Sequence, residues 1–325
     1  MSKAIRIHET GGPDVLRYED VDPGVPGPGE ALVRHGAVGV NFIDTYFRSG
    51  LYPLPSLPHG IGMEGAGTVE AVGEGVTVVK PGDRVAYTSG PPGAYAEVRR
   101  IAADRLVALP PSIDERTGAA MMLQGLTVEY LIRRTFPVQK GMTVLWHAAA
   151  GGVGLIACQW LTHLGVTVIG TVGSAEKAEL ARAHGCAHTI LYREEDFVAR
   201  VKDITNGKGV PVVYDSVAKD TAEGSLSCLS PRGMLVLFGN ASGKANPVDP
   251  MRLAQGGSLY LTRPQITDYV ATRDELVEAS TALFEVVQSG AVKIPARHEW
   301  PLAEAAEAHR ALEGRRTSGS IILTP

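Results

Sequence analysis

The chain has 325 residues, 44% of them hydrophobic and 20% charged, and a formal net charge of −4. This composition excludes fibrous and disordered proteins, and the length allows two domains with separate cores. The slightly acidic balance disfavours a nucleic-acid partner, because phosphate neutralisation needs clustered lysine and arginine. The N-terminal residues MSKAIRIHETGG lack the apolar segment of a signal peptide, and no stretch approaches 18 apolar residues, so we expect a cytoplasmic protein without a membrane span.

Residues 1 to about 112 predict an all-β unit, barrel-like or sandwich-like. Glycine- and proline-rich turns separate short segments of strand character. These segments are residues 3–9, 30–40, 65–73, 83–87 and 94–100.

From about residue 143 to 262, strand-like and helical segments alternate. Six apolar segments of strand character, the number that a doubly wound parallel sheet requires, are 143–147, 166–172, 188–192, 210–217, 233–239 and 258–262. Helical patterns between them include 174–185 and 194–207, and a further helix is expected from about 152 to 164. Two helices follow, over 273–290 and 302–314, and residues 319–325 predict a last strand that pairs with the first domain.

The turn after the strand at 143–147 is rich in glycine. Ala148, Gly151 and Gly154 form an A-x-x-G-x-x-G variant of the dinucleotide-binding fingerprint. We expect the backbone N–H groups of residues 149–153 to lie at a helix N-terminus, where the dipole favours an anion such as a pyrophosphate. A purely structural turn is the alternative, but the strand before it and the helix after it favour dinucleotide binding.

The residue types at the end of the second strand of this region bear on the choice of cofactor. An Asp or Glu there would bind the ribose 2′-hydroxyl of NAD. The sequence has Gly173 and Ser174 instead, followed one helical turn later by Lys177. The three cysteines, Cys158, Cys186 and Cys228, have no metal-site spacing and predict buried thiols.

Several blocks of the sequence resemble a known family. They are GVNFIDTYFRSGLYP, GMEGAGTVEAVGEGV, KPGDRVAY, QGLTVEYL, HAAAGGVGLIACQW, YREEDF, YDSV, LFGNASG and SLYLTRP. In order, and over nearly the whole chain, they are similar to the zinc-free quinone reductase branch, zeta-crystallin-like, of the medium-chain dehydrogenase/reductase superfamily. The resemblance implies an α/β protein. Its chaperonin-10-like catalytic domain would comprise 1–124 and 268–325, and its Rossmann domain 125–267, with a cofactor cleft at their junction.

The positions that bind zinc in the metal-dependent members of this superfamily differ here. Asn41 and Met63 stand where those enzymes have Cys and His, and the four-cysteine lobe is missing. A thioether and an amide are poor zinc ligands, so we expect no metal and no zinc-dependent alcohol oxidation. His59 lies near Met63 in the sequence, and a surface or packing role is the simpler interpretation.

Candidate catalytic residues follow from the block around Asn41. Asn41, Tyr46 and Tyr52 are candidates for polar groups facing the nicotinamide and the substrate; Tyr52 matches a position that related enoyl reductases use near the reacting carbon. Tyr46 could instead pack within the β domain with its hydroxyl hydrogen-bonded. Asp44 could be a helix-capping carboxylate.

The resemblance also implies cofactor contacts, with NADPH as the cofactor. A 2′-phosphate site would use Ser174, Lys177, Tyr192 and Arg315, although each residue taken singly could be an ordinary surface or strand-end side chain. Thr127 resembles a residue at the nicotinamide end, with a hydroxyl bonded to its own helix backbone as the alternative. The full expected set is Asn41, Thr127, Ala150, Gly151, Gly152, Val153, Gly173, Ser174, Lys177, Tyr192, Ser216, Phe238, Asn240 and Arg315.

The expected function is NADPH-dependent reduction of quinones by hydride transfer, without metal. The alternative within enzymes is a reductase of enones, alkenals or enoyl thioesters; a non-catalytic NADPH- or nucleic-acid-binding protein is disfavoured. Residues 257–262 form a hydrophobic last strand whose edge would be exposed, and family members pair this strand across a two-fold axis. We therefore expect a homodimer through this strand.

Overall fold

The computed structural model describes residues 1–294 and 296–325, which form two compact units. Unit 1 comprises Met1–Leu126, Val270–Gln288 and Ile294–Pro325, apart from residue 295. Unit 2 comprises Thr127–Tyr269 and Ser289–Lys293. Each unit is described by itself below.

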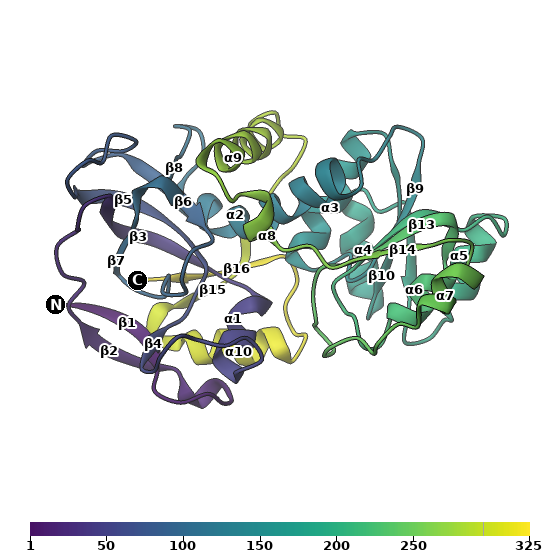
Figure 1. The fold of residues 1–325 in the computed structure, drawn as a ribbon, viewed down its shortest axis with the longest axis horizontal. Helices are drawn as coiled ribbons and strands as arrows, with labels where there is room; N and C mark the ends of the chain where they lie inside the picture. Colours follow the sequence, from purple (N-terminus) through teal and green to yellow (C-terminus); the bar gives the residue numbers. More distant parts are fainter. Residues whose placement is uncertain (295) are drawn as a thin grey trace. The chain divides into compact units, whose positions relative to one another are not determined.

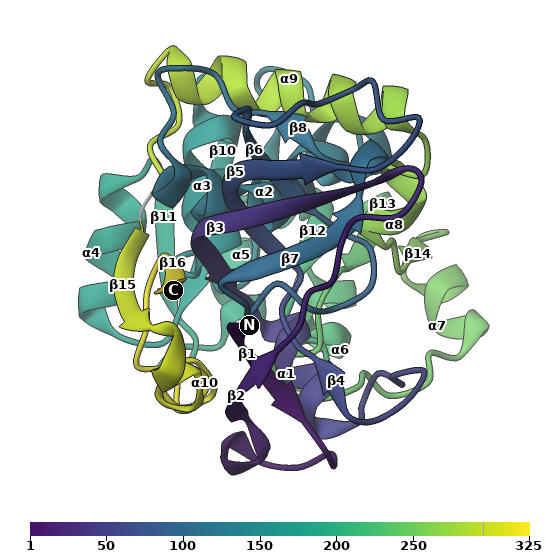
Figure 2. The ribbon, with the colours of Figure 1, turned by 90° about the vertical axis from the view of Figure 1, so that its left-hand side faces the viewer.

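Unit 1 is built on a mostly antiparallel sheet around the long strand β3 (Glu30–Val40). β3 pairs with β5 (Glu64–Val72) on one side and with the C-terminal strand β16 (Ser320–Thr324) on the other (Figure 2). The prediction that the last strand pairs with the first domain is therefore confirmed. The other strands of unit 1 are β1 (Ser2–Ile7), β2 (Arg17–Val21), β4 (His59–Gly60), β6 (Arg84–Thr88), β7 (Val98–Ala102), β8 (Val107–Ala108) and β15 (Ala296–Pro301).

Apolar side chains from both ends of the chain share the core of unit 1. Ile5, Val33 and Val85 from the N-terminal strands pack in one cluster with Leu302 and Leu323 from the C-terminal segment. Burial of these side chains stabilises the unit by roughly 1.5–3 kcal/mol for each large residue. The helices of unit 1 are α1 (Phe42–Ser49), α9 (Arg273–Gln288) and α10 (Ala305–Glu313); α2 (Glu115–Tyr130) begins in unit 1 and ends in unit 2.

Unit 2 contains the six-stranded parallel sheet that the sequence predicted. Its strand order is β11-β10-β9-β12-β13-β14, and the order along the sheet reverses between β9 and β12 as in a dinucleotide-binding sheet. Figure 1 labels four of these strands, β9, β10, β13 and β14, together with the helices of the same unit. The strands are β9 (Thr143–Trp146), β10 (Thr167–Val172), β11 (His188–Leu191), β12 (Val210–Asp215), β13 (Leu229–Leu237) and β14 (Tyr260–Thr262). The helices are α3 (Gly152–His163), α4 (Ala175–Ala183), α5 (Phe197–Ile204), α6 (Ala222–Ser227), α7 (Pro250–Gln255) and α8 (Ile266–Tyr269).

One predicted helix is shorter than expected. The pattern over 194–207 predicts a helix from its acidic start, but α5 begins only at Phe197. The Asp196 side chain accepts hydrogen bonds from the backbone of Val198 and Ala199, and it caps the helix. Glu195 instead accepts the backbone N–H of Leu191 and closes the turn before the helix.

Two further expectations concern the described part of the chain. Cys158, Cys186 and Cys228 are free and buried, as predicted. Among the described helices, none has the length and apolar character needed to cross a membrane.

Candidate functional site

One group of candidate residues lies in unit 1, where β3 ends and α1 begins. Asn41 has extended backbone angles, φ −133° and ψ 158°, and is the N-cap of α1. Asp44 Oδ2 accepts the backbone N–H of Asn41 at 2.8 Å, and the two residues form a capping box. The interpretation of Asp44 as a capping carboxylate is therefore confirmed.

Both the nitrogen and the oxygen of the Asn41 side-chain amide form hydrogen bonds with buried side chains. Its Nδ2 donates to Glu64 Oε1 at 2.5 Å, and its Oδ1 accepts from Gln124 Nε2 at 3.1 Å. Gln124 Oε1 accepts in turn from the Ser320 hydroxyl at 2.7 Å, and Glu64 Oε2 accepts the backbone N–H of Leu123 at 2.7 Å. The four polar side chains are buried, so these hydrogen bonds determine the orientation of the amide.

A second chain of hydrogen bonds reaches Asp44 from α10. Arg48 donates to His309 Nδ1 at 3.0 Å, so His309 carries its proton on Nε2 and donates to the Tyr95 hydroxyl at 3.0 Å. Tyr95 then donates to Asp44 Oδ2 at 2.9 Å, while Asp44 Oδ1 has no hydrogen-bond partner among the described residues. Arg48 also forms an ion pair with Glu313 at 2.8 Å. This chain connects the start of α1 to a charged pair at the end of α10.

Burial shifts the pKa values of the two carboxyl groups. It raises the pKa of Glu64 to about 8, against the opposing hydrogen bonds from Asn41 and Leu123. It also raises the pKa of Asp44 to about 7, although the Asn41 backbone and Tyr95 donate to the carboxylate. Both groups therefore change protonation state near neutral pH, which is a property of many functional sites.

Tyr46 and Tyr52, the two other candidate catalytic residues, lie together with Asn41 around α1. Their rings are 5.2 Å apart in an edge-on arrangement, and the Tyr52 backbone N–H donates to the Tyr46 carbonyl at 3.0 Å. Tyr46 is buried, whereas Tyr52 is half-buried. Of the two phenols, the Tyr52 hydroxyl is therefore the better candidate for contact with a bound molecule.

The side chains at the superfamily's zinc position do not fit the metal. Both polar ends of the Asn41 amide are engaged with Glu64 and Gln124, and Met63 offers only a buried thioether. His59 Nδ1 donates to the Gly60 carbonyl at 2.8 Å. In residues 1–294 and 296–325, no three His, Cys, Asp or Glu side chains gather in a metal-binding arrangement.

Another group of candidate residues lies in unit 2, at the turn between β9 and α3. A Cβ at Gly154 would lie 2.4 Å from the Ala148 carbonyl oxygen, so only glycine allows α3 to pack so close to the turn. Ala148 itself has a left-handed φ of 55°. Gly151, Gly152 and Val153 are partly exposed at the start of the helix, as an anion site requires.

Two of the five backbone N–H groups expected to face an anion do not do so. The N–H of Ala149 donates to the Thr171 carbonyl at 3.0 Å, because the chain leaving β9 stays paired with β10. The N–H of Gly151 donates to the Ala148 carbonyl at 2.9 Å and closes the tight turn. The first turn of α3, from Gly152, therefore holds the N–H groups that can bind a phosphate.

Three of the residues expected near a 2′-phosphate, Ser174, Lys177 and Tyr192, follow the ends of β10 and β11. A Cβ at Gly173 would lie 3.4 Å from the Tyr192 hydroxyl and 3.7 Å from Arg193 Nε, so the missing side chain leaves room there. Ser174 caps α4 and accepts the backbone N–H of Lys177 at 3.4 Å. Arg193 was not among the residues expected at this site. Its position directly after an expected strand was the available signal.

Three further expected residues lie where β12 and β13 end. The backbone of Phe238 donates to the Asp215 carbonyl at 2.9 Å, and the backbone of Ala241 donates to the Ser216 carbonyl at 3.0 Å. Ser216, Phe238 and Asn240 are thus brought to the same carboxyl edge of the sheet as the glycine turn. In open α/β sheets this edge is where ligands bind.

A buried network fixes that edge. The Thr171 hydroxyl donates to His147 Nδ1, His147 Nε2 donates to Ser225, and Ser225 donates to Asp215 Oδ2, each at 2.9 Å. Burial lowers the pKa of His147, which keeps the ring neutral and suited to this pattern. Because the Ser225 hydroxyl donates to Asp215 and not to His147, His147 cannot activate Ser225 as a nucleophile. The network therefore has a structural role.

Two remaining expected residues belong to other elements. Thr127 lies in α2, and its hydroxyl is hydrogen-bonded to the Tyr130 phenol. Arg315 belongs to unit 1, follows α10 in a left-handed conformation with φ 56°, and is exposed.

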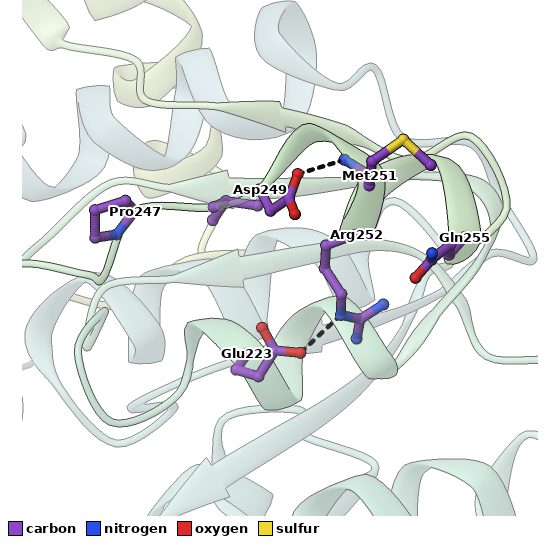
Figure 3. A pocket seen from close by; sticks show the side chains of 7 residues that line it. Glu223, Pro247, Asp249, Met251, Arg252 and Gln255 are labelled. Carbon is purple, nitrogen blue, oxygen red and sulfur yellow. Dashed lines mark hydrogen bonds and ion pairs between the residues drawn. The ribbon is translucent and has the colours of Figure 1, made fainter.

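A surface pocket in unit 2 contains none of the expected site residues. Its lining comes from α6, α7 and the segment before α7 (Figure 3). Arg252 forms an ion pair with Glu223 at 2.7 Å across it, and Asp249 accepts the backbone N–H of Met251 at its mouth (Figure 3). These charges are already paired, and the pocket lacks a group poised for chemistry.

Comparisons with known proteins agree with the geometry. Residues 27–111 match the family model described as alcohol dehydrogenase GroES-like domain, and residues 152–280 match the model described as zinc-binding dehydrogenase. A GroES-like unit combined with a nucleotide-binding sheet defines the medium-chain class of dehydrogenases and reductases. The chain is 54% identical to a quinone oxidoreductase of Pseudomonas aeruginosa, over all of both chains.

Two other comparisons indicate the branch of this superfamily to which the chain belongs. An Escherichia coli quinone oxidoreductase, solved in complex with NADPH, superposes with a TM-score of 0.98 at 50% identity and covers 99% of this chain and 100% of its own. A 2-haloacrylate reductase of Burkholderia sp is 47% identical over 100% of this chain and 99% of its own length. The chain belongs to the zinc-free quinone reductase branch of the medium-chain dehydrogenase/reductase superfamily.

Proposed function

We propose that this protein is an NADPH:quinone oxidoreductase that reduces quinones without a metal ion. The observation that carries the proposal is the gathering of the glycine turn, Gly173, Tyr192 and Ser216 along one carboxyl edge of a parallel sheet. The full-length likeness to quinone oxidoreductases supports the same reaction. When bound, NADPH would supply the hydride that the quinone accepts.

The cofactor would be held mainly by unit 2. We assign the pyrophosphate to the partly exposed start of α3, with the N–H groups of Gly152 and Val153 as donors. Ala150, Gly151, Ser216, Phe238, Asn240 and Thr127 complete the expected contacts. The end of β10 lacks a carboxylate that would repel a 2′-phosphate, and Ser174, Lys177, Tyr192 and Arg315 offer donors and positive charge instead.

The substrate would be handled by residues around α1 in unit 1. We assign Asn41 and Tyr52 to hydrogen bonds with the acceptor or the nicotinamide, and Tyr46 to the wall beside Tyr52. A quinone accepts hydride readily because the negative charge that develops is spread over an aromatic ring. A strong general acid is therefore not required.

A second candidate substrate class is an activated alkene. The 2-haloacrylate reductase, at 47% identity over the whole chain, carries a name that specifies such a substrate. Hydride addition to an alkene beside a carboxylate or carbonyl also places negative charge on oxygen, so Asn41 and Tyr52 could serve in the same way.

We also propose that the protein is a cytoplasmic homodimer. β14 is an edge strand that pairs only with β13 in the described sheet, and Tyr260 on it is 58% exposed. Residues 257–262 would continue the sheet into a second copy and cover this edge.

Steady-state oxidation of NADPH with 1,4-benzoquinone, 9,10-phenanthrenequinone and 2-chloroacrylate tests the proposal. We expect turnover with at least one quinone and a higher kcat/KM for quinones than for the acrylate. Preference for the acrylate would favour the alkene reductase. Tight NADPH binding without turnover on the whole panel would indicate a binding protein.

A further inference from the structure

Four buried side chains form an unbroken row of reversible hydrogen bonds in unit 1. The row runs from Ser320 through Gln124 and Asn41 to Glu64, with donor–acceptor distances of 2.7, 3.1 and 2.5 Å. The exposed fractions of these residues are 0, 6, 8 and 0%. A primary amide has a donor end and an acceptor end. A half turn of the amide group therefore exchanges the donor and the acceptor that it presents to its two neighbours.

The protonation state of Glu64 selects the direction of the row. The structure has the arrangement in which Glu64 only accepts, so Asn41 turns Nδ2 toward Glu64 and Oδ1 toward Gln124. A protonated Glu64 donates its O–H proton instead, and it requires an acceptor on Asn41. Asn41 then presents Oδ1 to Glu64 and Nδ2 to Gln124, Gln124 turns in response, and the Ser320 hydroxyl accepts at the far end.

The neighbouring groups hold the Glu64 carboxyl group beside Asn41 in both protonation states. Its second oxygen accepts the backbone N–H of Leu123 at 2.7 Å in either state. A Cβ at Gly39 would lie 2.2 Å from Glu64 Oε1, so the glycine makes the space that the carboxyl group fills. The carboxyl group therefore stays in contact with Asn41, and the two states differ in whether Glu64 carries a proton.

We propose that Glu64 and Gln124 are positioning residues that orient the Asn41 amide, and that protonation of Glu64 switches this orientation. The inference deepens the proposed function, because it rests on Asn41 contacting the substrate or the cofactor. Asn41 has one oxygen lone pair and one N–H that neither Glu64 nor Gln124 uses. These two groups exchange positions when Glu64 changes from the ionised to the protonated state. The hydrogen bond that Asn41 offers to a bound molecule changes accordingly.

The titratable groups around Glu64 favour a switch close to neutral pH. Burial raises the pKa of Glu64, the hydrogen bonds from Asn41 and Leu123 oppose that rise, and repulsion from Asp44 of α1 adds a smaller increase. Tyr87 of β6 and Tyr95 face the same carboxyl group, but burial keeps both phenols protonated well above this range. His35 of β3, hydrogen-bonded to Tyr87, has its pKa lowered by burial to about 4 and is neutral there.

The decisive experiment compares the pH profile of kcat, from pH 6 to 9, between the wild type and Glu64→Gln. The glutamine amide donates to Asn41 as a carboxylic acid does, and its oxygen still accepts from Leu123. We expect two plateaus with an inflection near pH 8 in the wild type, and loss of this inflection in Glu64→Gln. An unchanged inflection in Glu64→Gln, or a flat wild-type profile, would overturn the proposal.

Two more variants separate positioning from general damage to the core. Gln124→Met keeps the size of the side chain and removes its hydrogen bonds; we expect kcat to fall about three- to tenfold with little change in the KM for NADPH. Thr88→Val is the matched control, since Thr88 is buried opposite Glu64 on β6 and its hydroxyl has no partner in the described structure. The control should keep the wild-type profile. An equal effect of both variants would contradict the proposal.

Infrared difference spectra give a readout that does not need turnover. The carboxylic acid band of the free protein should titrate near pH 8 in the wild type, and that component should be missing in Glu64→Gln. If the band titrates as expected but no quinone is reduced, the proposed function fails and the switch remains. If quinones are reduced and no such band titrates, the switch fails and the function remains.

Discussion

The hydroxyl of Tyr95 donates a 2.9 Å hydrogen bond to Oδ2 of Asp44, and both side chains are completely buried. The same hydroxyl accepts from His309 Nε2 at 3.0 Å. One phenol thus joins the carboxylate that caps α1 to the imidazole that α10 supplies. The start of α1, which carries the candidate catalytic residues, depends on this contact.

Tyr95→Phe should destabilise the protein without changing its fold. The ring remains, but His309 is left with a buried N–H that has no acceptor, and Asp44 loses one of its two donors. Each such loss costs about 1–3 kcal/mol. Urea denaturation should show a lower free energy of unfolding. Tyr18→Phe, at an exposed tyrosine, is the control; equal stability of the two variants would show that the contact contributes nothing.

The stability of the protein should fall as the pH rises from 7 to 8. The pKa of Glu64 is raised from 4.5 to about 8 by burial, so in this range the unfolded chain has lost the proton that the folded chain still holds. The stabilisation is fully present below pH 4.5 and is lost up to about pH 8. The expected decrease between pH 7 and 8 is about 1 kcal/mol. Denaturant titrations at both pH values should show it, and Glu64→Gln should remove most of it, because Asp44 retains a smaller dependence of the same sign.

Tyr52→Phe should lower turnover about ten- to a hundredfold, which corresponds to about 1.4–2.7 kcal/mol of transition-state stabilisation. The substitution keeps the ring contacts with Tyr46 and Phe47 and removes only the hydroxyl. Stopped-flow oxidation of NADPH with an accepted quinone provides the measurement. Unchanged turnover would assign Tyr52 to the wall of the site.

Lys177→Ala and Arg315→Ala should each raise the KM for NADPH and barely change that for NADH. Each charge-assisted contact with a 2′-phosphate is worth about 1.5–3 kcal/mol, so two of them predict a preference for NADPH of about a hundredfold or more. Lys202→Ala, at an exposed lysine of α5, is the control. An equal rise in the KM for NADPH and the KM for NADH would indicate that the 2′-phosphate binds elsewhere.

Tyr260→Asp should shift the protein from dimer to monomer. The change places a charge on the edge strand β14, and across a two-fold axis two such charges would oppose each other. Light scattering at micromolar concentration should give twice the chain mass for the wild type and a lower mass for the variant. Val25→Asp, at an apolar residue that is 82% exposed in unit 1, should remain dimeric. A monomeric wild type would refute the dimer.

Local patterns in the sequence were sufficient to predict the parallel sheet, the glycine turn and the return of the last strand to the first unit. Runs of apolar residues between turn signals specify strands, and the spacing of Ala148, Gly151 and Gly154 specifies a tight turn into a helix. These features depend on neighbours in the chain, so a linear reading detects them. The same reading identified Asn41 through the family resemblance.

Only the tertiary structure showed what surrounds Asn41. Glu64, Gln124 and Ser320 lie 23, 83 and 279 positions from it in the sequence, on three separate segments of the chain. A linear reading gives no reason to place them together, because hydrogen-bond partners are selected by strand pairing and helix packing. The pairing of β3 with β5 and β16, and the position of α2, bring the four side chains into one buried row. Burial then shifts the pKa of Glu64, because desolvation acts only on a group that the fold has enclosed.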